Sequence, residues 1–315
     1  MLLQYNYVNY SQQVKIQVYS PVKRGFSIYE RVRNEPAVRE KVFNIIYLSS
    51  FLLSRREVNN PNIYPYHVFA DKTEKFILFK PITVLCGNNA SGKSTLLNII
   101  ANKLNLEGKE YCACNKYSIT PYFSDFVNEC GYELGEDESG RQFTQIPEKS
   151  RYIKSEDILY EIKKIQQEEI LADGYIYEHV RKGMPKDGVN LLRSSKEMYK
   201  QMEYMKFAQE KYSNGETTMQ ILEDCLEMDA LYLLDEPEVS LSPANQVLLA
   251  ERINQMARLL HCQFIISTHS PFMLGSLNAK IYNLDSKDLD VVKWTELDNI
   301  RYFYDFFDKH KCEFK

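Results

Sequence analysis

The sequence has no long uninterrupted apolar run. Its most apolar stretch, residues 43–53, contains Ser49 and Ser50 and is shorter than the roughly 20 residues that a membrane-spanning helix needs. The first residues also lack a basic start followed by an apolar core, which is the pattern of an export signal. We therefore expect no membrane insertion and a cytoplasmic location.

A large excess of charge and a regular cysteine pattern are also missing. The formal net charge is −4, so the chain as a whole does not attract nucleic acid, and any such binding would rest on a local basic patch. The seven cysteines are odd in number and scattered. Cys112 and Cys114 lie close together but lack a second pair at metal-ligand spacing, which favours reduced thiols over a zinc site.

A glycine-containing loop stands between an apolar run, residues 82–86, and a helical pattern, residues 96–100. Its spacing of Gly, four residues and Gly-Lys-Ser is typical of a phosphate-binding loop, whose backbone N–H groups point inward. Lys93 can then reach the β- and γ-phosphates, the Ser94 hydroxyl can bind Mg²⁺, and the following helix directs its positive end at the same phosphates. The nucleotide-binding residues predicted in this loop are Gly87, Asn88, Asn89, Ala90, Ser91, Gly92, Lys93, Ser94 and Thr95.

Two further apolar runs end in polar residues. Residues 230–236 end in Asp235 and Glu236, whose side chains should point to opposite sides of a strand. We expect Asp235 to join the Mg²⁺ shell beside Ser94 and Glu236 to hold and polarise the attacking water. Residues 263–267 lead to His269, which should emerge at the carboxyl end of a parallel strand, where ligands bind in open α/β sheets, close to the γ-phosphate or the water.

These residues, in this order, resemble the motifs of soluble, non-transporter ATP-binding-cassette (ABC) and AAA-family ATPases. Residues 87–95 match the Walker A motif, residues 231–236 match Walker B with its catalytic Glu, residues 240–242 match the D-loop, and His269 matches the switch histidine. The cassette signature is matched by Ser213, Asn214, Gly215 and Glu216, with a helix expected over residues 217–227. The resemblance implies an α/β fold, a P-loop NTPase of ABC type. Its mostly parallel central sheet would be flanked by helices, with an antiparallel β subdomain and a helical subdomain.

The resemblance also implies a mechanism. ATP and Mg²⁺ would be bound and ATP hydrolysed between two chains stacked head to tail, each signature segment acting on the partner's nucleotide, so the protein should form a homodimer on ATP binding. The cycle would be coupled to a partner protein or to DNA, as in phage defence or repair. Two alternatives remain open: the nucleotide-binding subunit of an ABC transporter, and a binding module that uses ATP only as a switch.

The sequence departs from the family pattern at two motifs. In the signature, Asn214 stands where the first glycine is usual and Glu216 stands where glutamine is usual, a variation similar to that of soluble cassette proteins in DNA repair and phage defence. In the Q-loop, Glu156 occupies the region of the expected Mg²⁺-contacting residue. Gln142 and Gln145 remain alternatives for that position.

The remaining segments are assigned from composition and periodicity. Residues 1–61 are interpreted as an N-terminal extension of unclear role, with helical spacing over 36–54. Residues 62–315 form the ATPase domain, in which 104–150 is an insertion and about 151–212 a helical subdomain.

The stretch 64–83 looks strand-like, and Tyr64 and Tyr66 are candidates for stacking on adenine, although packing is the simpler interpretation for either because tyrosine is abundant in this chain. Four basic residues form a loose cluster: Arg181, Lys182, Lys186 and Arg193. The cluster could contact nucleic acid, although a solvated face is the simpler interpretation.

Overall fold

The structure is a computed structural model that describes residues 45–60, 62–72, 75–110, 122–137, 139–158, 160 and 214–314. These residues belong to one compact unit, residues 42–315. Ser213, the two close cysteines at 112 and 114, the basic cluster at 181–193 and residues 1–44 lie outside the described residues. No helix in the described part of the chain is long and apolar enough to cross a membrane.

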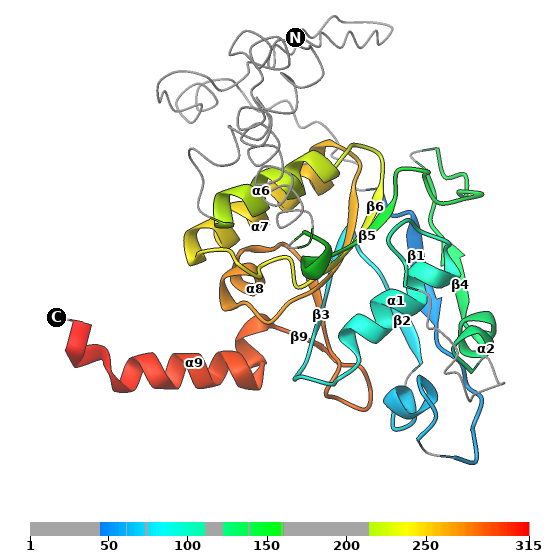
Figure 1. The fold of residues 1–315 in the computed structure, drawn as a ribbon, viewed down its shortest axis with the longest axis horizontal. Helices are drawn as coiled ribbons and strands as arrows, with labels where there is room; N and C mark the ends of the chain where they lie inside the picture. Colours follow the sequence, from blue (N-terminus) through cyan, green and yellow to red (C-terminus); the bar gives the residue numbers. More distant parts are fainter. Residues whose placement is uncertain are drawn as a thin grey trace, which may run out of the picture. The chain divides into compact units, whose positions relative to one another are not determined.

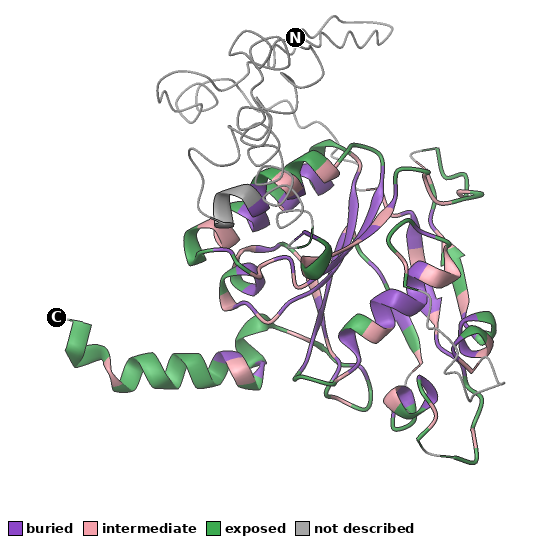
Figure 2. Cartoon of the chain, viewed as in Figure 1, coloured by how far each residue is buried: buried purple, intermediate pink, exposed green. Residues whose placement is uncertain are grey.

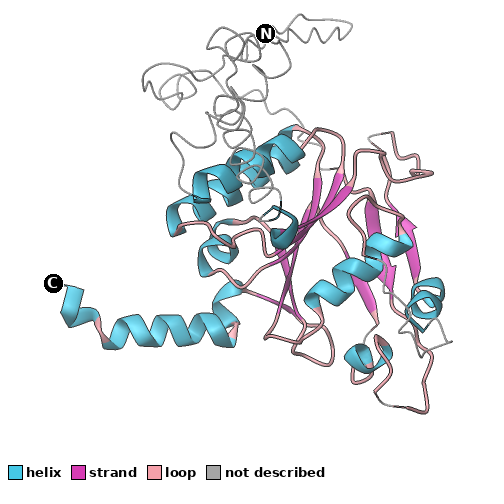
Figure 3. Ribbon diagram, in the orientation of Figure 1, coloured by secondary structure: helices cyan, strands magenta, loops and turns pink. Residues whose placement is uncertain are grey.

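A six-stranded sheet with the order β5-β6-β7-β3-β8-β9 forms the centre of the described unit (Figure 3). The first five strands run parallel, and β9 pairs antiparallel with β8. The strands are β3 (Ile82–Cys86), β5 (Arg151–Lys154), β6 (Leu231–Asp235), β7 (Gln263–Ser267), β8 (Lys280–Asn283) and β9 (Val291–Val292). The prediction of a mostly parallel central sheet is confirmed, and β7 lies between the strand before the glycine loop and the strand of the acidic pair.

The central strands are buried on both faces. In β6, Leu231 and Leu233 pack into one hydrophobic cluster, whereas Tyr232 and Leu234 pack into another on the opposite face. This alternation follows from the two-residue period of a strand. Parallel strands covered on both sides are apolar throughout, which explains the uninterrupted apolar runs in the sequence (Figure 2).

Helices cover both faces of this sheet (Figure 1). One hydrophobic cluster contains side chains of α1 (Lys93–Lys103) and α2 (Tyr122–Glu129). The other contains side chains of α6 (Asn214–Cys225), α7 (Pro243–Leu259) and α8 (Pro271–Ser276). The last long helix, α9 (Asp298–Lys309), is followed by a short 3-10 helix, Lys311–Phe314, and two more 3-10 helices lie at Tyr66–Phe69 and Trp294–Glu296.

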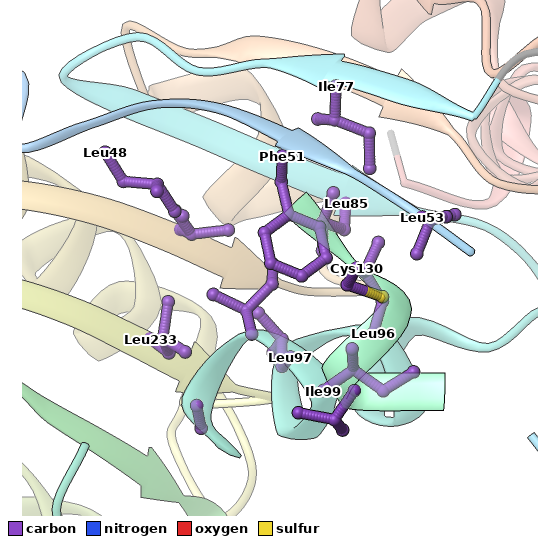
Figure 4. Close-up of a cluster of buried hydrophobic side chains, with 14 of the residues drawn as sticks. Leu48, Phe51, Leu53, Ile77, Leu85, Leu96, Leu97, Ile99, Cys130 and Leu233 are labelled. Carbon is purple, nitrogen blue, oxygen red and sulfur yellow. The ribbon is translucent and has the colours of Figure 1, made fainter. Parts of the chain in front are cut away.

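A second, antiparallel sheet packs on the α1 side. Its order is β2-β1-β4, with β1 (Leu48–Leu52), β2 (Phe76–Leu78) and β4 (Gly131–Leu134). The ring of Phe51 is fully buried in the same cluster as Leu97 of α1 (Figure 4). The Gln263 side chain of β7 joins the two sheets, because it accepts hydrogen bonds from the Tyr47 and Leu48 N–H groups and donates to the Leu48 carbonyl.

Two local predictions were wrong. The helical spacing read over residues 36–54 does not describe 48–52, which form β1, since pairing with β2 and β4 overrides a short apolar pattern that fits either structure. The strand-like stretch 64–83 contains a 3-10 helix, and within it only 76–78 and the start of β3 are strand.

The described unit also differs in extent from the predicted ATPase domain. Its described part starts at residue 45 and includes β1, the central strand of the antiparallel sheet, so the unit extends well before residue 62. The segment 104–150, interpreted as an insertion, supplies α2 and β4 to the core of this unit.

Candidate functional site

The glycine loop, residues 87–92, joins the end of β3 to the start of α1. Lys93 is the first residue of α1 and its side chain is buried, 5% exposed. Its ammonium donates hydrogen bonds to the carbonyls of Gly87 (3.0 Å) and Asn88 (3.1 Å), so it curls back under the loop. Burial lowers the pKa of Lys93, which means that the site holds a cation that an anionic ligand would stabilise.

Gly92 is the residue on which the loop geometry depends. Its φ of +94° lies in the left-handed region, where residues with a Cβ are strained. A Cβ at this position would also lie 2.5 Å from Val68 Cγ1, which is closer than any real contact. The backbone at the entry to α1 therefore requires glycine.

Asp235 is the last residue of β6 and contacts the first turn of α1, just after the loop. It shares the sheet face of Leu231 and Leu233, which is the face that α1 covers. Its Oδ1 accepts hydrogen bonds from the Ser94 hydroxyl (3.1 Å) and the Ser267 hydroxyl, and its Oδ2 accepts one from the Tyr152 hydroxyl (3.2 Å). Three adjacent strands thus hold this buried carboxylate against α1.

Glu236 and His269 form a second pair at the same edge of the sheet. His269 Nε2 lies 3.5 Å from Glu236 Oε1, without hydrogen-bond geometry, and this nitrogen is buried with no hydrogen-bond partner in the part of the chain that the structure describes. Burial, and then the nearby Lys93, lower the pKa of His269, so the imidazole is neutral at neutral pH. Glu236 has a φ of +48°, and a strained left-handed residue of this kind is typical of functional sites.

Glu238 holds the backbone before His269 in place. Its Oε1 accepts hydrogen bonds from the His269 N–H (2.8 Å) and from the Thr268 hydroxyl (2.6 Å). Its Oε2 is buried, and the described residues offer it no partner. Burial raises the pKa of Glu238. Sequence reasoning missed this role, although the residue stands only two positions after Glu236.

Asp285 also contacts the glycine loop, through the backbone of Asn88. Both of its carboxylate oxygens accept hydrogen bonds from the Asn88 N–H, at 3.0 and 2.9 Å. Asp285 follows β8, which pairs with β3 and therefore ends beside the loop. No sequence motif pointed to it.

The pattern of partnered and unpartnered atoms fits a phosphate ligand with a hard cation. Ser91 Oγ in the loop is buried without a partner among the described residues, as is His269 Nε2. Ser94 and Asp235 offer oxygen atoms, the ligand type that Mg²⁺ prefers, side by side. The residues present therefore match Mg²⁺-ATP, with the loop and Lys93 for the phosphates.

The signature residues are described only in part. Asn214, Gly215 and Glu216 lie in the first turn of α6, which begins at residue 214. The helix was expected to begin at residue 217, so the structure places these three residues inside it and not in a preceding turn.

The candidates for the Q-loop lie in different parts of the unit. Glu156 follows β5, whose last residue, Lys154, pairs with Asp235, and its side chain is exposed. The Gln142 side chain donates to the Leu134 carbonyl, on the strand of the antiparallel sheet. Gln145 is exposed in the stretch between that strand and β5. The register therefore favours Glu156 as the residue at the edge of the site.

The two aromatic candidates, Tyr64 and Tyr66, differ in exposure. Tyr66 is 4% exposed and donates a hydrogen bond to Glu129, so its ring packs in the core, as the simpler interpretation expected, and it is no longer a candidate for stacking on adenine. Tyr64 is 39% exposed, and its hydroxyl lies 3.5 Å from the Thr95 hydroxyl in the first turn of α1. Its ring stacks on Phe123, with 6.0 Å between ring centroids. Tyr64 remains the candidate.

A phosphate-binding loop between a buried parallel strand and a helix, with an acidic pair at the end of a second strand of the same sheet, is the arrangement of a P-loop nucleotide-binding domain. Comparison with protein families agrees: the family model described as "AAA domain, putative AbiEii toxin, Type IV TA system" matches residues 120–275, just under half of the chain. A comparison with curated proteins gives no match. The chain carries a P-loop ATPase domain of the ABC/AAA type.

Several solved structures are similar to the chain. One is the Smc head domain of Pyrococcus furiosus bound to the C-terminal domain of ScpA, with 14% identity, 84% of this chain and 99% of that chain covered, and a TM-score of 0.33. Another is a nucleotide-free ATP-binding cassette from an ABC transporter, with 15% identity, coverage of 76% and 87%, and a TM-score of 0.37. A third is the SMC head domain from Thermotoga maritima, with 12% identity, coverage of 76% and 94%, and a TM-score of 0.38. At these TM-scores the likenesses add nothing to the assignment, which rests on the strand order, the loop and the family model.

The buried carboxylate of Glu238 gives a prediction about stability and pH. Because its folded pKa is raised above the ordinary value of 4.5, the folded protein holds this proton more tightly than the unfolded chain does. The stability that results is present at low pH and is lost as the pH rises from 4.5 through the folded pKa. In Glu238→Gln this loss is absent. The free energy of unfolding of the variant, relative to that of the wild type, should therefore increase as the pH rises from 4.5 to 7.

Urea unfolding of both proteins across this range measures the difference. Glu251→Gln, which alters an exposed glutamate of α7, is the matched control and should follow the wild type. A difference between Glu238→Gln and wild type that stays constant with pH would show that Glu238 does not titrate in this window.

Proposed function

We propose that this protein binds Mg²⁺-ATP at the edge of the central sheet and hydrolyses it to ADP and phosphate. The observation that carries the proposal is the position of Asp235, whose carboxylate bonds Ser94 just after the loop that Lys93 supports. Steady phosphate release by the purified protein in the presence of Mg²⁺ is the direct test. ATP binding without turnover would leave the switch module as the better description.

The proposed roles follow from the chemistry of each group. The loop N–H groups and the ammonium of Lys93 bind the β- and γ-phosphates. Glu236 accepts a proton from the water that attacks the γ-phosphorus, and the bond to the bridging oxygen breaks so that ADP leaves. His269, neutral and 3.5 Å from Glu236, can donate a hydrogen bond to the same water or to a γ-phosphate oxygen.

A bound Mg²⁺ would neutralise charge on the phosphate oxygens. Ser94 and Asp235 are the residues proposed to hold it, either directly or through water, with Glu156 as a further candidate at the end of β5. The Tyr152 and Ser267 hydroxyls, which donate to the Asp235 carboxylate, keep that carboxylate directed at α1.

We further propose that two chains sandwich the nucleotides head to tail. Residues 214–216 lie in the first described turn of α6, and a helix N-terminus at this place would favour a phosphate. Ser213, Asn214, Gly215 and Glu216 would then contact the γ-phosphate bound by the partner subunit. Glu236→Gln should trap the homodimer, since it keeps ATP unhydrolysed.

The expected result is a doubling of the solution mass of Glu236→Gln on addition of Mg²⁺-ATP. Adding Ser213→Arg to this variant should block the doubling while leaving ATP binding, because the large cation would stand between the two chains. Light scattering with and without nucleotide measures both outcomes. A Ser213→Arg variant that still doubles in mass would contradict the head-to-tail arrangement.

The proposed coupling is to a partner protein or to DNA, in a process such as phage defence or repair. The description of the matching family model, which names a toxin of a toxin–antitoxin system, favours a role controlled by a partner. Repeating the mass measurement with DNA present separates the two: a further increase with DNA favours nucleic acid, and no increase directs the search to proteins.

The proposed setting is the cytoplasm, where thiols stay reduced. Cys86, Cys130 and Cys262 are buried as free thiols, and burial raises the pKa of each to about 11, so they behave as small apolar groups.

Within the described residues no group of three His, Cys, Asp or Glu side chains is placed to hold a metal ion.

A further inference from the structure

Helix α9 carries a row of exposed aromatic side chains. Ile300, near its start, is buried in the core cluster and attaches the helix to the rest of the unit. Beyond it Phe303 is 42% exposed, Tyr304 63% and Phe307 53%. Figure 2 shows the helix exposed along most of its length. Large apolar side chains gathered in this way mark an interaction site.

The row follows the helical repeat. Ile300, Phe303, Tyr304 and Phe307 stand at positions i, i+3, i+4 and i+7, so they form one stripe along a single face. Phe314 extends this aromatic surface, with its ring centroid 6.1 Å from that of Phe307. The stripe is therefore continuous and long enough to receive another helix.

The polar side chains beside the stripe complement one another. Arg301 and Asp308 are seven residues apart and so lie on the same flank. Over residues 298–311 the three aspartates balance the one arginine and two lysines. Two copies of this helix therefore do not repel each other.

We propose that α9 docks antiparallel against α9 of a second copy of this chain, independently of nucleotide. A two-fold axis beside residues 304 and 305 places Phe303 opposite Phe307 of the partner subunit. It also places Arg301 next to Asp308 of the partner subunit, and symmetry repeats each contact. The stripe thus pairs apolar with apolar side chains and is complementary to itself in charge.

The contact differs from the nucleotide sandwich in its requirements. It uses no residue of the loop or of the signature segment, so it persists without ATP. A single pair of helices of about 18 Å buries a small area, and we expect a weak dimer that appears over about 1–100 µM. Such a dimer would raise the local concentration of ATPase domains before nucleotide binds.

Charge reversal provides the test. The parent protein is the full chain carrying Lys93→Ala, measured without nucleotide, so that the ATP-dependent sandwich cannot form. Arg301→Asp and Asp308→Arg each place like charges together at two symmetric points. Each should weaken the dimer about tenfold, measured as Kd by sedimentation. The double variant Arg301→Asp/Asp308→Arg should recover the Kd of the parent protein.

Mixing the two single variants gives a further readout. A mixed dimer pairs two acidic positions with two basic positions, so the mixture should associate about tenfold more tightly than either variant alone. Phe303→Ser should abolish association, and Tyr302→Ser, on the opposite side of the helix and 72% exposed, is the matched control. Circular dichroism checks that each variant is folded.

Three results would overturn the proposal. They are a protein that stays monomeric throughout this range, a dimer that is indifferent to both charge reversals, and single variants that fail to associate when mixed. A monomer would mean that another segment or another protein covers α9. None of these results affects the ATP-dependent doubling of Glu236→Gln, so failure here and failure of the proposed function are distinguishable.

Discussion

Replacing Glu236 by glutamine is expected to slow ATP turnover by about 10²-fold or more while ATP binding is retained. Glutamine has the shape of glutamate, so its side chain can occupy the same position beside His269, whose Nε2 lies 3.5 Å from Glu236 Oε1. It cannot accept a proton from the attacking water. The left-handed backbone at this position, with φ +48°, is equally strained for both residues, so the substitution adds no new strain.

Phosphate release under saturating ATP measures this effect, and equilibrium binding of ATP measures what is retained. Glu251→Gln, at the exposed position on α7, controls for the loss of one negative charge and should turn over ATP at the wild-type rate. Turnover of Glu236→Gln near the wild-type rate would assign the role of base to another group. Loss of binding together with turnover would indicate that Glu236 supports the site itself.

The central part of the site was predictable because its chemistry is encoded locally. The loop, the acidic pair and His269 each follow an apolar run that forms a parallel strand. Carboxyl ends of parallel strands meet at one edge of a sheet, so three separated motifs could be placed together without a structure. The observed contact between Ser94 and Asp235 is the result of this rule.

The supporting residues could not be predicted in the same way. Tyr152 and Ser267 reach Asp235 only because β5 and β7 pair on either side of β6, and the register that aligns them depends on the whole sheet. Asp285 reaches the loop because β8 lies beside β3. Common residue types at isolated positions carry no local pattern, so sequence reasoning had nothing to detect.

The errors in the fold came from short apolar segments. Residues 48–52 fit both a helix and a strand, and the choice was made by partners far along the chain, at 76–78 and 131–134. The buried Gln263 fixes this strand to the central sheet through its side chain amide. Interactions across such distances decide the structure of a segment that has no distinctive period of its own.

Replacing Lys93 by alanine is expected to weaken ATP binding by about 10²-fold or more. Hydrogen bonds to charged groups contribute about 1.5–3 kcal/mol each, and in the proposed site the Lys93 ammonium binds the β- and γ-phosphates. In the structure this ammonium donates hydrogen bonds to the carbonyls of Gly87 and Asn88. Burial lowers the pKa of Lys93, so a phosphate beside the ammonium would stabilise its charged form.

Titration calorimetry or a fluorescent ATP analogue measures the change in Kd, and thermal unfolding checks that the variant is folded. Lys103→Ala is the matched control, because Lys103 lies at the far end of the same helix and donates to the Asn128 carbonyl. It should bind ATP as the wild type does. Unchanged ATP affinity in a folded Lys93→Ala protein would remove the loop from the nucleotide site, and with it the roles proposed for Ser94 and Asp235, because both depend on the phosphates lying above α1.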